Sequence, residues 1–175
     1  MKYTSYLKED HPVVTLKVKN LGDIQIELFP EVAPNTVHQF IALVDRGFYN
    51  GLIFHRIIPS FMIQGGWGKE KLSPIKGEFT SNGFKNELRH TRGVISMART
   101  NDPNSQTSQF FIMHDHAPHL DGNYAAFGGV LSGMDVVDKI AKSPRDNQDR
   151  PLEDIVIESA QIDLKGKQYP DPIYQ

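Results

Sequence analysis

Residues 54–66 read FHRIIPSFMIQGG, two short apolar runs on either side of Pro59 and Ser60. If the runs form a pair of strands, the guanidinium of Arg56 lies among apolar side chains, loses its water and must find a partner. The spacing alone favours pairing with a carboxylate or a carbonyl of the core. The amide of Gln64 is a candidate neighbour, because it can both accept and donate hydrogen bonds.

Similar strand-forming runs recur along the chain, and loops rich in Gly, Asn and Ser separate them. Residues 13–28 alternate between apolar and polar side chains, which predicts a hairpin that turns within residues 20–23. The other runs are residues 53–58, 61–64, 94–98, 109–113, 124–130 and 155–162.

Two segments carry helical periodicity instead. Pro34 suits a first helical position, apolar residues follow at helical spacing, and Gly47 is a plausible stop. A second helix is expected over residues 134–141, before Pro144 prevents its continuation. Many short strands with only two helices indicate a closed barrel or a sandwich.

The composition is that of one soluble domain. The chain has 175 residues, of which 39% are hydrophobic and 23% charged, and its formal charge is −2. That balance argues against a domain built around nucleic acid, which needs a concentrated basic surface. Cysteine is absent, so disulfides, thiolate metal sites and cysteine nucleophiles are excluded. We find no secretory signal and no apolar run of about 18 residues, so we expect a cytoplasmic protein without membrane contact.

A second apolar cluster, QFFIM over residues 109–113, follows a loop of small polar residues. Alternation along a strand places Gln109 and Phe111 on one face and Phe110 on the other. One face therefore carries an amide beside an aromatic ring. Both a ligand groove and the end of a core strand fit that description.

Other local patterns are weaker. His114, His116 and His119 invite a metal site, but their spacing matches no closed tetrahedral scheme. Residues 65–69, GGWGK, lack the spacing of a phosphate-binding loop. No sequence signature of a serine hydrolase is present.

Taken together, several blocks resemble the cyclophilin family of peptidyl-prolyl cis–trans isomerases, most closely its bacterial cytoplasmic branch. The resemblance implies a mainly β fold, a closed eight-stranded antiparallel β-barrel capped by two α-helices. We accordingly expect an N-terminal extension over residues 1–12, the isomerase domain over 13–163 and a C-terminal tail over 164–175. The matching blocks are FHRIIP (54–59), FMIQGG (61–66), SMA (96–98), SQFFI (108–112), LDG (120–122) and FG (127–128).

By position, the resemblance makes Arg56 the catalytic residue. It assigns the proline pocket to Phe61, Met62, Phe111 and Leu120, and the binding of the peptide backbone to Gln64, Ala98 and Gln109. Three further groove positions depart from many eukaryotic members: His119 replaces a tryptophan, Tyr124 a histidine and Arg99 an asparagine. Because the tryptophan contributes to cyclosporin binding in the family, we expect only weak cyclosporin binding here.

The implied function is isomerisation of Xaa-Pro bonds in proline-containing polypeptides, which assists protein folding. The resemblance calls for no metal and no other cofactor, and we expect a monomer. The alternative is a module or chaperone that binds proline peptides with little turnover. Such a binder can dispense with the arginine, whereas this chain has Arg56.

Overall fold

Eight antiparallel strands form one curved sheet in residues 3–175, the part of the chain that the computed structural model describes. Met1 and Lys2, which begin the expected extension, lie outside it. The strands follow the order β3-β4-β6-β5-β7-β2-β1-β8. Their bounds are β1 Val13–Val18, β2 Gly22–Leu28, β3 Phe54–Ile58, β4 Met62–Gly65, β5 Val94–Met97, β6 Phe110–Met113, β7 Ala126–Ser132 and β8 Ile157–Asp163.

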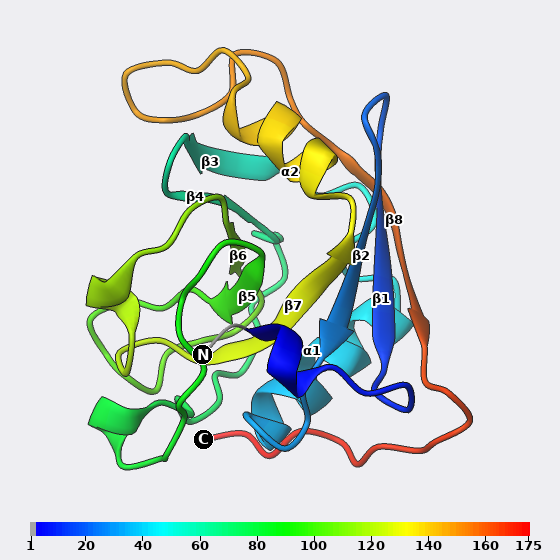
Figure 1. Cartoon of the computed structure of the whole chain (residues 1–175), viewed down its shortest axis with the longest axis vertical. Helices are drawn as coiled ribbons and strands as arrows, with labels where there is room; N and C mark the ends of the chain where they lie inside the picture. Colours follow the sequence, from blue (N-terminus) through cyan, green and yellow to red (C-terminus); the bar gives the residue numbers. More distant parts are fainter. Residues whose placement is uncertain (1–2) are drawn as a thin grey trace.

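Two α-helices, α1 (Pro34–Asp45) and α2 (Met134–Ala141), lie toward opposite ends of the sheet (Figure 1). Both were predicted from the sequence. Three short 3₁₀ helices complete the described elements: η1 (Tyr3–Tyr6), η2 (Thr80–Asn82) and η3 (Pro118–Leu120). The fold is thus mainly β, as expected.

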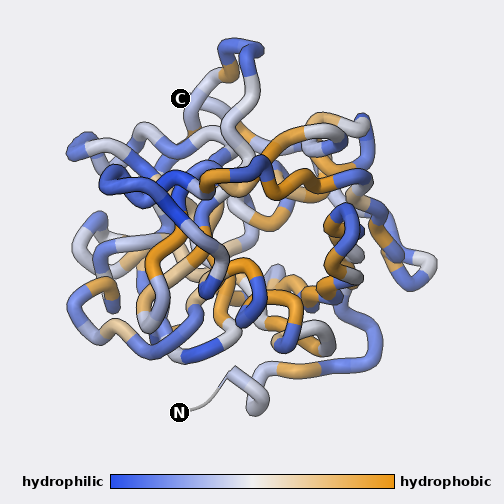
Figure 2. Tube along the Cα trace, turned by 90° about the horizontal axis from the view of Figure 1, so that it is seen from above, coloured by the Kyte–Doolittle hydropathy of each residue, from blue (hydrophilic) through white to orange (hydrophobic). Residues whose placement is uncertain are grey.

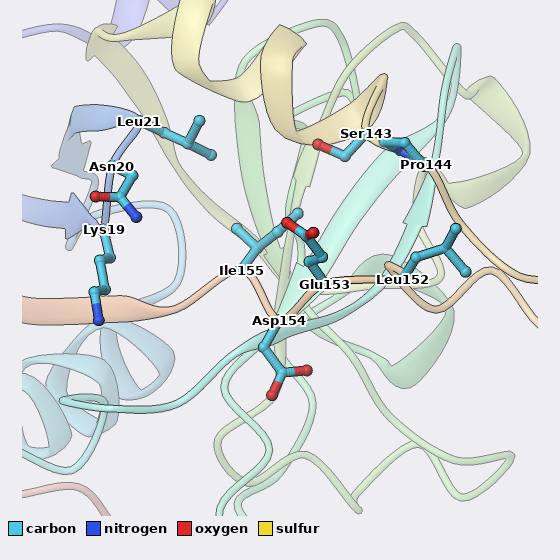
Figure 3. Close-up of a pocket in the computed structure, with 9 residues that line it drawn as sticks. All are labelled: Lys19, Asn20, Leu21, Ser143, Pro144, Leu152, Glu153, Asp154 and Ile155. Atoms are coloured by element: carbon cyan, nitrogen blue, oxygen red, sulfur yellow. The ribbon is translucent and has the colours of Figure 1, made fainter.

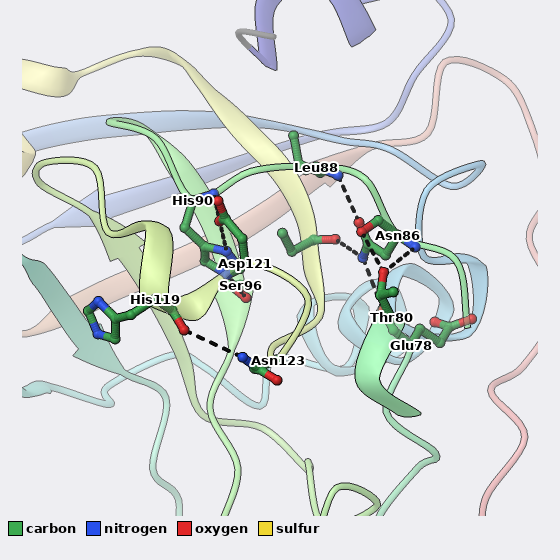
Figure 4. Close-up of polar contacts among 10 residues, drawn as sticks. Glu78, Thr80, Asn86, Leu88, His90, Ser96, His119, Asp121 and Asn123 are labelled. Atoms are coloured by element: carbon green, nitrogen blue, oxygen red, sulfur yellow. Dashed lines mark hydrogen bonds and ion pairs between the residues drawn. The ribbon is translucent and has the colours of Figure 1, made fainter. Parts of the chain in front are cut away.

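The start of α1 is capped by a residue that is distant in sequence. The buried Glu78 carboxylate accepts the backbone N–H of Thr36 at 2.7 Å and that of Asn35 at 3.2 Å. These N–H groups have no partner within the helix, and a carboxylate also suits the positive end of the helix dipole. Asn86 holds this segment in place, because its Nδ2 donates to the carbonyls of Glu78 and Ala126, both at 3.0 Å (Figure 4).

Aromatic side chains fill much of the space between the curved sheet and α1. Phe40 of α1 packs against Tyr49, Phe110 and Phe127, with ring centroids 5.2–5.7 Å apart. Seen from above, hydrophobic segments gather around the middle of the molecule, while most outer loops are hydrophilic (Figure 2). Because side chains fill the space that the curved sheet encloses, we expect a substrate to bind on the outside of the sheet.

The prediction of a closed barrel is wrong in one respect, because the ladder stays open between β3 and β8. One isolated bridge, Ile53 to Val156, links the two edges. Along the rest of β3, the irregular segment before β8 takes the place of a strand. The carbonyl of Ile155 accepts the N–H of Phe54 at 3.0 Å, and that of Asp149 accepts the N–H of Ile57 at 2.8 Å. The outer edge of β3 is therefore covered by a loop.

Both ends of the described chain are attached to the sheet and α1. The Tyr3 hydroxyl donates to the carbonyl of Val130 at 2.8 Å, and buried His11 contacts the carboxylate of Glu27 at 2.9 Å. At the other end, the backbone of Ile173 exchanges two hydrogen bonds with the amide of Asn35, of 2.7 and 2.8 Å. The last residues thus run beside α1 (Figure 1).

Candidate active site

One cavity of about 160 Å³ brings together nine of the eleven site residues expected from the sequence. Its walls come from β3, β4 and β6, from the segment after β5 and from η3 with the loop that follows it. The lining residues are Arg56, Phe61, Met62, Gln64, Ala98, Arg99, Phe111, Leu120 and Tyr124.

Arg56 stands at the rim of this cavity, where it is exposed to solvent. A β-bulge interrupts the pairing of β3 between Phe54 and Arg56, so Phe54 is fully buried while the arginine points outward. The expectation of an arginine desolvated among apolar side chains is therefore wrong. Simple alternation across the strand did not allow for the extra residue.

The guanidinium of Arg56 belongs to a short line of polar side chains. Its Nη1 donates to Oε1 of Gln64 at 3.3 Å, and Nε2 of Gln64 donates to Oε1 of Gln109 at 3.0 Å. Among residues 3–175, no carboxylate forms an ion pair with Arg56. A guanidinium has five N–H donors, so Arg56 keeps donors free for a substrate.

Phe111 forms a wall of the cavity, and three hydrogen-bonded side chains, those of His90, Ser96 and Asp121, support it from behind. The ring of His90 stacks on Phe111 with centroids 5.9 Å apart, and Tyr124 meets Phe111 edge-on at 5.7 Å. His90 Nδ1 lies 3.1 Å from Oδ1 of Asp121, and Nε2 lies 2.8 Å from Oγ of Ser96 (Figure 4). Since the carboxylate accepts, Nδ1 carries the proton and Nε2 accepts from the hydroxyl.

This Ser–His–Asp connectivity is not a hydrolytic site. Ser96 is completely buried, with 0% of its surface exposed, so its hydroxyl cannot reach a substrate carbonyl. The arrangement instead fixes the ring behind Phe111. No local sequence pattern predicts this arrangement, because 6 positions separate His90 from Ser96 and 31 separate it from Asp121.

Arg99 also lines the cavity and is held in a fixed position. Its guanidinium carbon sits 4.8 Å from the ring centre of Phe79 and 4.7 Å from that of Tyr124. Its Nε and Nη2 both donate to the carbonyl of Asn123. Such double stacking suits arginine better than lysine.

The remaining two expected residues lie next to the cavity. Gln109 lines an adjoining cavity of about 180 Å³, together with small polar residues of the loop that precedes it. His119 is exposed on η3, with its ring 5.8 Å from that of Phe61. Both therefore border the cavity without forming its walls.

Larger cavities exist elsewhere in the described chain. One of about 370 Å³ lies between the β1–β2 hairpin, the end of α2 and the loop before β8 (Figure 3). Its walls combine apolar side chains such as Leu21 and Leu152 with the acidic Glu153 and Asp154. None of the expected site residues reaches it.

The structure does not gather the three loop histidines into a metal site. His114 contacts Asp138, His116 contacts its own neighbour Asp115, and His119 packs against Phe61. In residues 3–175, no three metal-ligating side chains come close enough to share an ion.

Stability should decrease in mild acid. Burial lowers the pKa of His55 and, against the opposing effect of Asp121, that of His90. Both pKa values rise to about 6.5 in the unfolded chain, which therefore binds more protons as the pH falls. We expect the free energy of unfolding, measured by urea denaturation, to be smaller at about pH 5 than at about pH 7. Equal or greater stability at the lower pH would contradict this assignment.

Comparison with known proteins agrees with this geometry. Residues 13–162 match the family model described as cyclophilin type peptidyl-prolyl cis-trans isomerase/CLD. A peptidyl-prolyl cis-trans isomerase from Acinetobacter baylyi is 49% identical over 158 residues, covering 82% of this chain and 81% of that protein. Peptidyl-prolyl cis-trans isomerase A from Dickeya dadantii is 44% identical over 161 residues, covering 84% of this chain and 83% of its own.

Solved structures give the same result. A cyclophilin type isomerase from Cryptosporidium parvum superposes with a TM-score of 0.78 at 32% identity, over 87% of this chain and 97% of its own. The same Cryptosporidium parvum protein in the presence of the dipeptide Ala-Pro gives a TM-score of 0.77. The chain belongs to the cyclophilin-type peptidyl-prolyl cis–trans isomerase family, and the resemblance seen in its sequence is confirmed. Within residues 3–175, no helix has the length and apolar character needed to cross a bilayer.

Proposed function

We propose that this protein catalyses cis–trans rotation about Xaa-Pro bonds in polypeptides, with Arg56 as its catalytic residue. One observation carries the assignment of the residue. An exposed guanidinium, which has no carboxylate partner within residues 3–175, stands at the rim of a largely apolar cavity of about 160 Å³. The function itself is tested by the exchange between the cis and trans forms of an Ala-Pro peptide, which catalytic amounts of the protein must accelerate.

Rotation about the Xaa-Pro bond requires a hydrogen-bond donor rather than a group that transfers a proton. The C–N bond before proline is a partial double bond with a rotational barrier of about 18–20 kcal/mol. At the twisted transition state, conjugation is lost and the proline nitrogen gains a free lone pair. A donor aimed at this lone pair binds the transition state more tightly than the planar ground state, which is what catalysis requires. Arg56 suits this role because it stays protonated and presents a rigid fork of donors.

The apolar walls of the cavity and the hydrogen-bonded side chains of Gln64 and Gln109 have complementary roles. Phe61, Met62, Phe111 and Leu120 enclose the proline ring and exclude water from the rotating amide. Excluding water favours the twisted form, because the planar amide is the more polar one. Gln64 and Gln109 hold the peptide backbone on the side of the Arg56 guanidinium. The N–H of Ala98 already donates to the carbonyl of Gln109 at 2.9 Å, so Ala98 offers a substrate only its carbonyl oxygen.

We further propose that the enzyme works as a cytoplasmic monomer that assists protein folding and needs no cofactor. The electrostatic mechanism supports the last point, because neither the donor nor the pocket depends on a bound ion or group. A formal charge of −2 supports polypeptides rather than nucleic acid as partners.

Replacing His119 by tryptophan should tighten cyclosporin binding about tenfold. The exposed His119 ring lies 5.8 Å from Phe61, so a larger ring there extends the apolar surface of the groove. An additional 50–60 Å² of buried apolar area is worth about 1.4 kcal/mol, or about a factor of ten in affinity. Isothermal titration calorimetry measures the change, with His116→Trp as a control outside the groove. Equal affinities of wild type and His119→Trp would show that position 119 does not contact the ligand.

A further inference from the structure

The β3–β4 turn leads directly into the proline pocket, and its conformation is unfavourable for its sequence. The N–H of Phe61 donates to the carbonyl of Ile58 at 3.1 Å across a turn with Pro59 and Ser60 at its centre. Ser60 has φ +65°, at a turn position where glycine is the usual residue. A side chain in the left-handed region persists only where neighbouring groups hold it.

His114 contacts this turn at two points. Its ring Nδ1 accepts the backbone N–H of Ser60 at 2.8 Å, and its own backbone N–H donates to the carbonyl of Phe61 at 2.9 Å. Both bonds lie immediately before Met62, and Phe61 and Met62 are walls of the cavity. The pairing of Met62 with Met113 and a 3.4 Å bond from the Asp115 N–H to the Phe61 carbonyl also hold these walls. His114, the residue that follows β6, adds the contact to Ser60 that fixes the turn itself.

The opposite edge of the His114 ring is also fixed. Nε2 lies 3.0 Å from Oδ1 of Asp138 in α2, and only 10% of the His114 side chain is exposed. Arg92 holds that carboxylate with two bonds of 2.7 and 2.8 Å, and it donates to the carbonyl of His114 at 3.0 Å. Asp138 thus cannot rotate away without losing three charged contacts.

These contacts determine where the ring proton sits. A backbone N–H only donates, so Nδ1 must offer its lone pair to Ser60. The proton then lies on Nε2, the ring nitrogen that is 3.0 Å from Oδ1 of Asp138. Asp138 favours the same tautomer, because its negative charge stabilises a proton on the nearby Nε2.

We propose that His114, oriented by Asp138, is a positioning residue for the proline pocket. It keeps Ser60 in the left-handed conformation and so sets the place of Phe61 and Met62. This inference rests on the proposed isomerase function. Phe61 and Met62 grip the proline ring in the ground state as well as in the transition state, and the other two walls, Phe111 and Leu120, still exclude water from the amide when the turn moves. Displacement of Phe61 and Met62 should therefore change KM more than kcat. Arg56 lies before the turn and keeps its own bond to Gln64.

The kinetic test compares leucine and asparagine at position 114. Leucine fills the space without an acceptor, and we expect His114→Leu to raise KM for an Ala-Pro peptide about fivefold to tenfold while kcat stays within about twofold. In His114→Asn the side-chain oxygen takes the place of Nδ1, so KM should return to within about twofold of wild type. His116→Leu is the matched control, because the His116 ring is exposed and contacts its own neighbour Asp115.

A rescue variant separates positioning from general loss of stability. Ser60→Gly removes the strain of the left-handed conformation. Adding it to His114→Leu should therefore lower the raised KM part of the way toward the wild-type value. An unchanged KM in a folded His114→Leu protein would overturn the proposal. A fall in kcat at constant KM would do the same.

A second measurement does not depend on any variant. In the ¹⁵N spectrum of the imidazole groups of the wild type at neutral pH, His114 should show an unprotonated Nδ1 and a protonated Nε2. A protonated Nδ1 would overturn the proposed contact with Ser60. Because this spectrum requires no substrate, it separates failure of the turn contact from failure of the isomerase function.

Discussion

Arg56→Ala should lower kcat/KM for an Ala-Pro peptide by about 100- to 1000-fold, the range seen when one donor to a transition state is removed. The side chain is exposed, and it donates to the half-buried amide of Gln64 at 3.3 Å, so its removal leaves no buried group unsatisfied. We therefore expect the circular dichroism spectrum and the urea midpoint to match those of the wild type. A protease-coupled peptide assay measures the rate.

Two further arginine variants sharpen this test. Arg56→Lys keeps the positive charge but loses the planar fork, so its activity should fall between those of wild type and Arg56→Ala. Arg89 is exposed outside the cavity, and Arg89→Ala should leave kcat/KM unchanged. A folded Arg56→Ala protein that keeps more than about a third of the wild-type kcat/KM would show that the guanidinium is not the transition-state donor.

Phe110→Ala and Phe111→Ala should affect different properties, although the two residues are neighbours in β6. Phe110 is fully buried and meets Phe40, Tyr49 and Phe54 edge-on. Its truncation should cost about 3–5 kcal/mol of unfolding free energy. At urea concentrations below the unfolding transition, the folded variant should have a kcat/KM within about threefold of wild type, because Phe110 does not line the cavity.

Phe111→Ala removes a wall of the cavity and the ring that packs on His90 and Tyr124. We expect kcat/KM to fall about 100-fold, because a lost aromatic contact of about 3 kcal/mol corresponds to about two powers of ten. Urea denaturation and the peptide assay on both variants test the pair. Equal loss of activity in the two folded variants would contradict the assignment of opposite faces.

Much of this architecture is predictable because it follows from local periodicity. Alternation separated Phe110 from Gln109 and Phe111, and the structure places the first in the core and the other two at the groove. Pro34 and the helical spacing after it predicted the start of α1. Apolar spacing and Pro144 likewise predicted α2. In each case, the deciding signal lies within a dozen residues.

Features that depend on contacts between distant segments could not be predicted from the sequence. The bulge in β3 exposes Arg56, and nothing in residues 53–58 marks where the extra residue falls. The loop that covers the outer edge of β3 leaves the barrel open, although the number of strands was correct. The support of Phe111 by His90, Ser96 and Asp121 joins residues from three separate segments.

The central claim is that this groove turns over Xaa-Pro bonds and that Arg56 is the group responsible. Exchange NMR on a short Ala-Pro peptide tests it most directly, with catalytic amounts of wild type and of Arg56→Ala in parallel samples. Uncatalysed exchange takes tens to hundreds of seconds, so even modest catalysis is visible. We predict rapid exchange with the wild type and little acceleration with the variant. Chemical-shift changes without accelerated exchange in the wild-type sample would instead identify a proline-binding module and contradict the enzyme assignment.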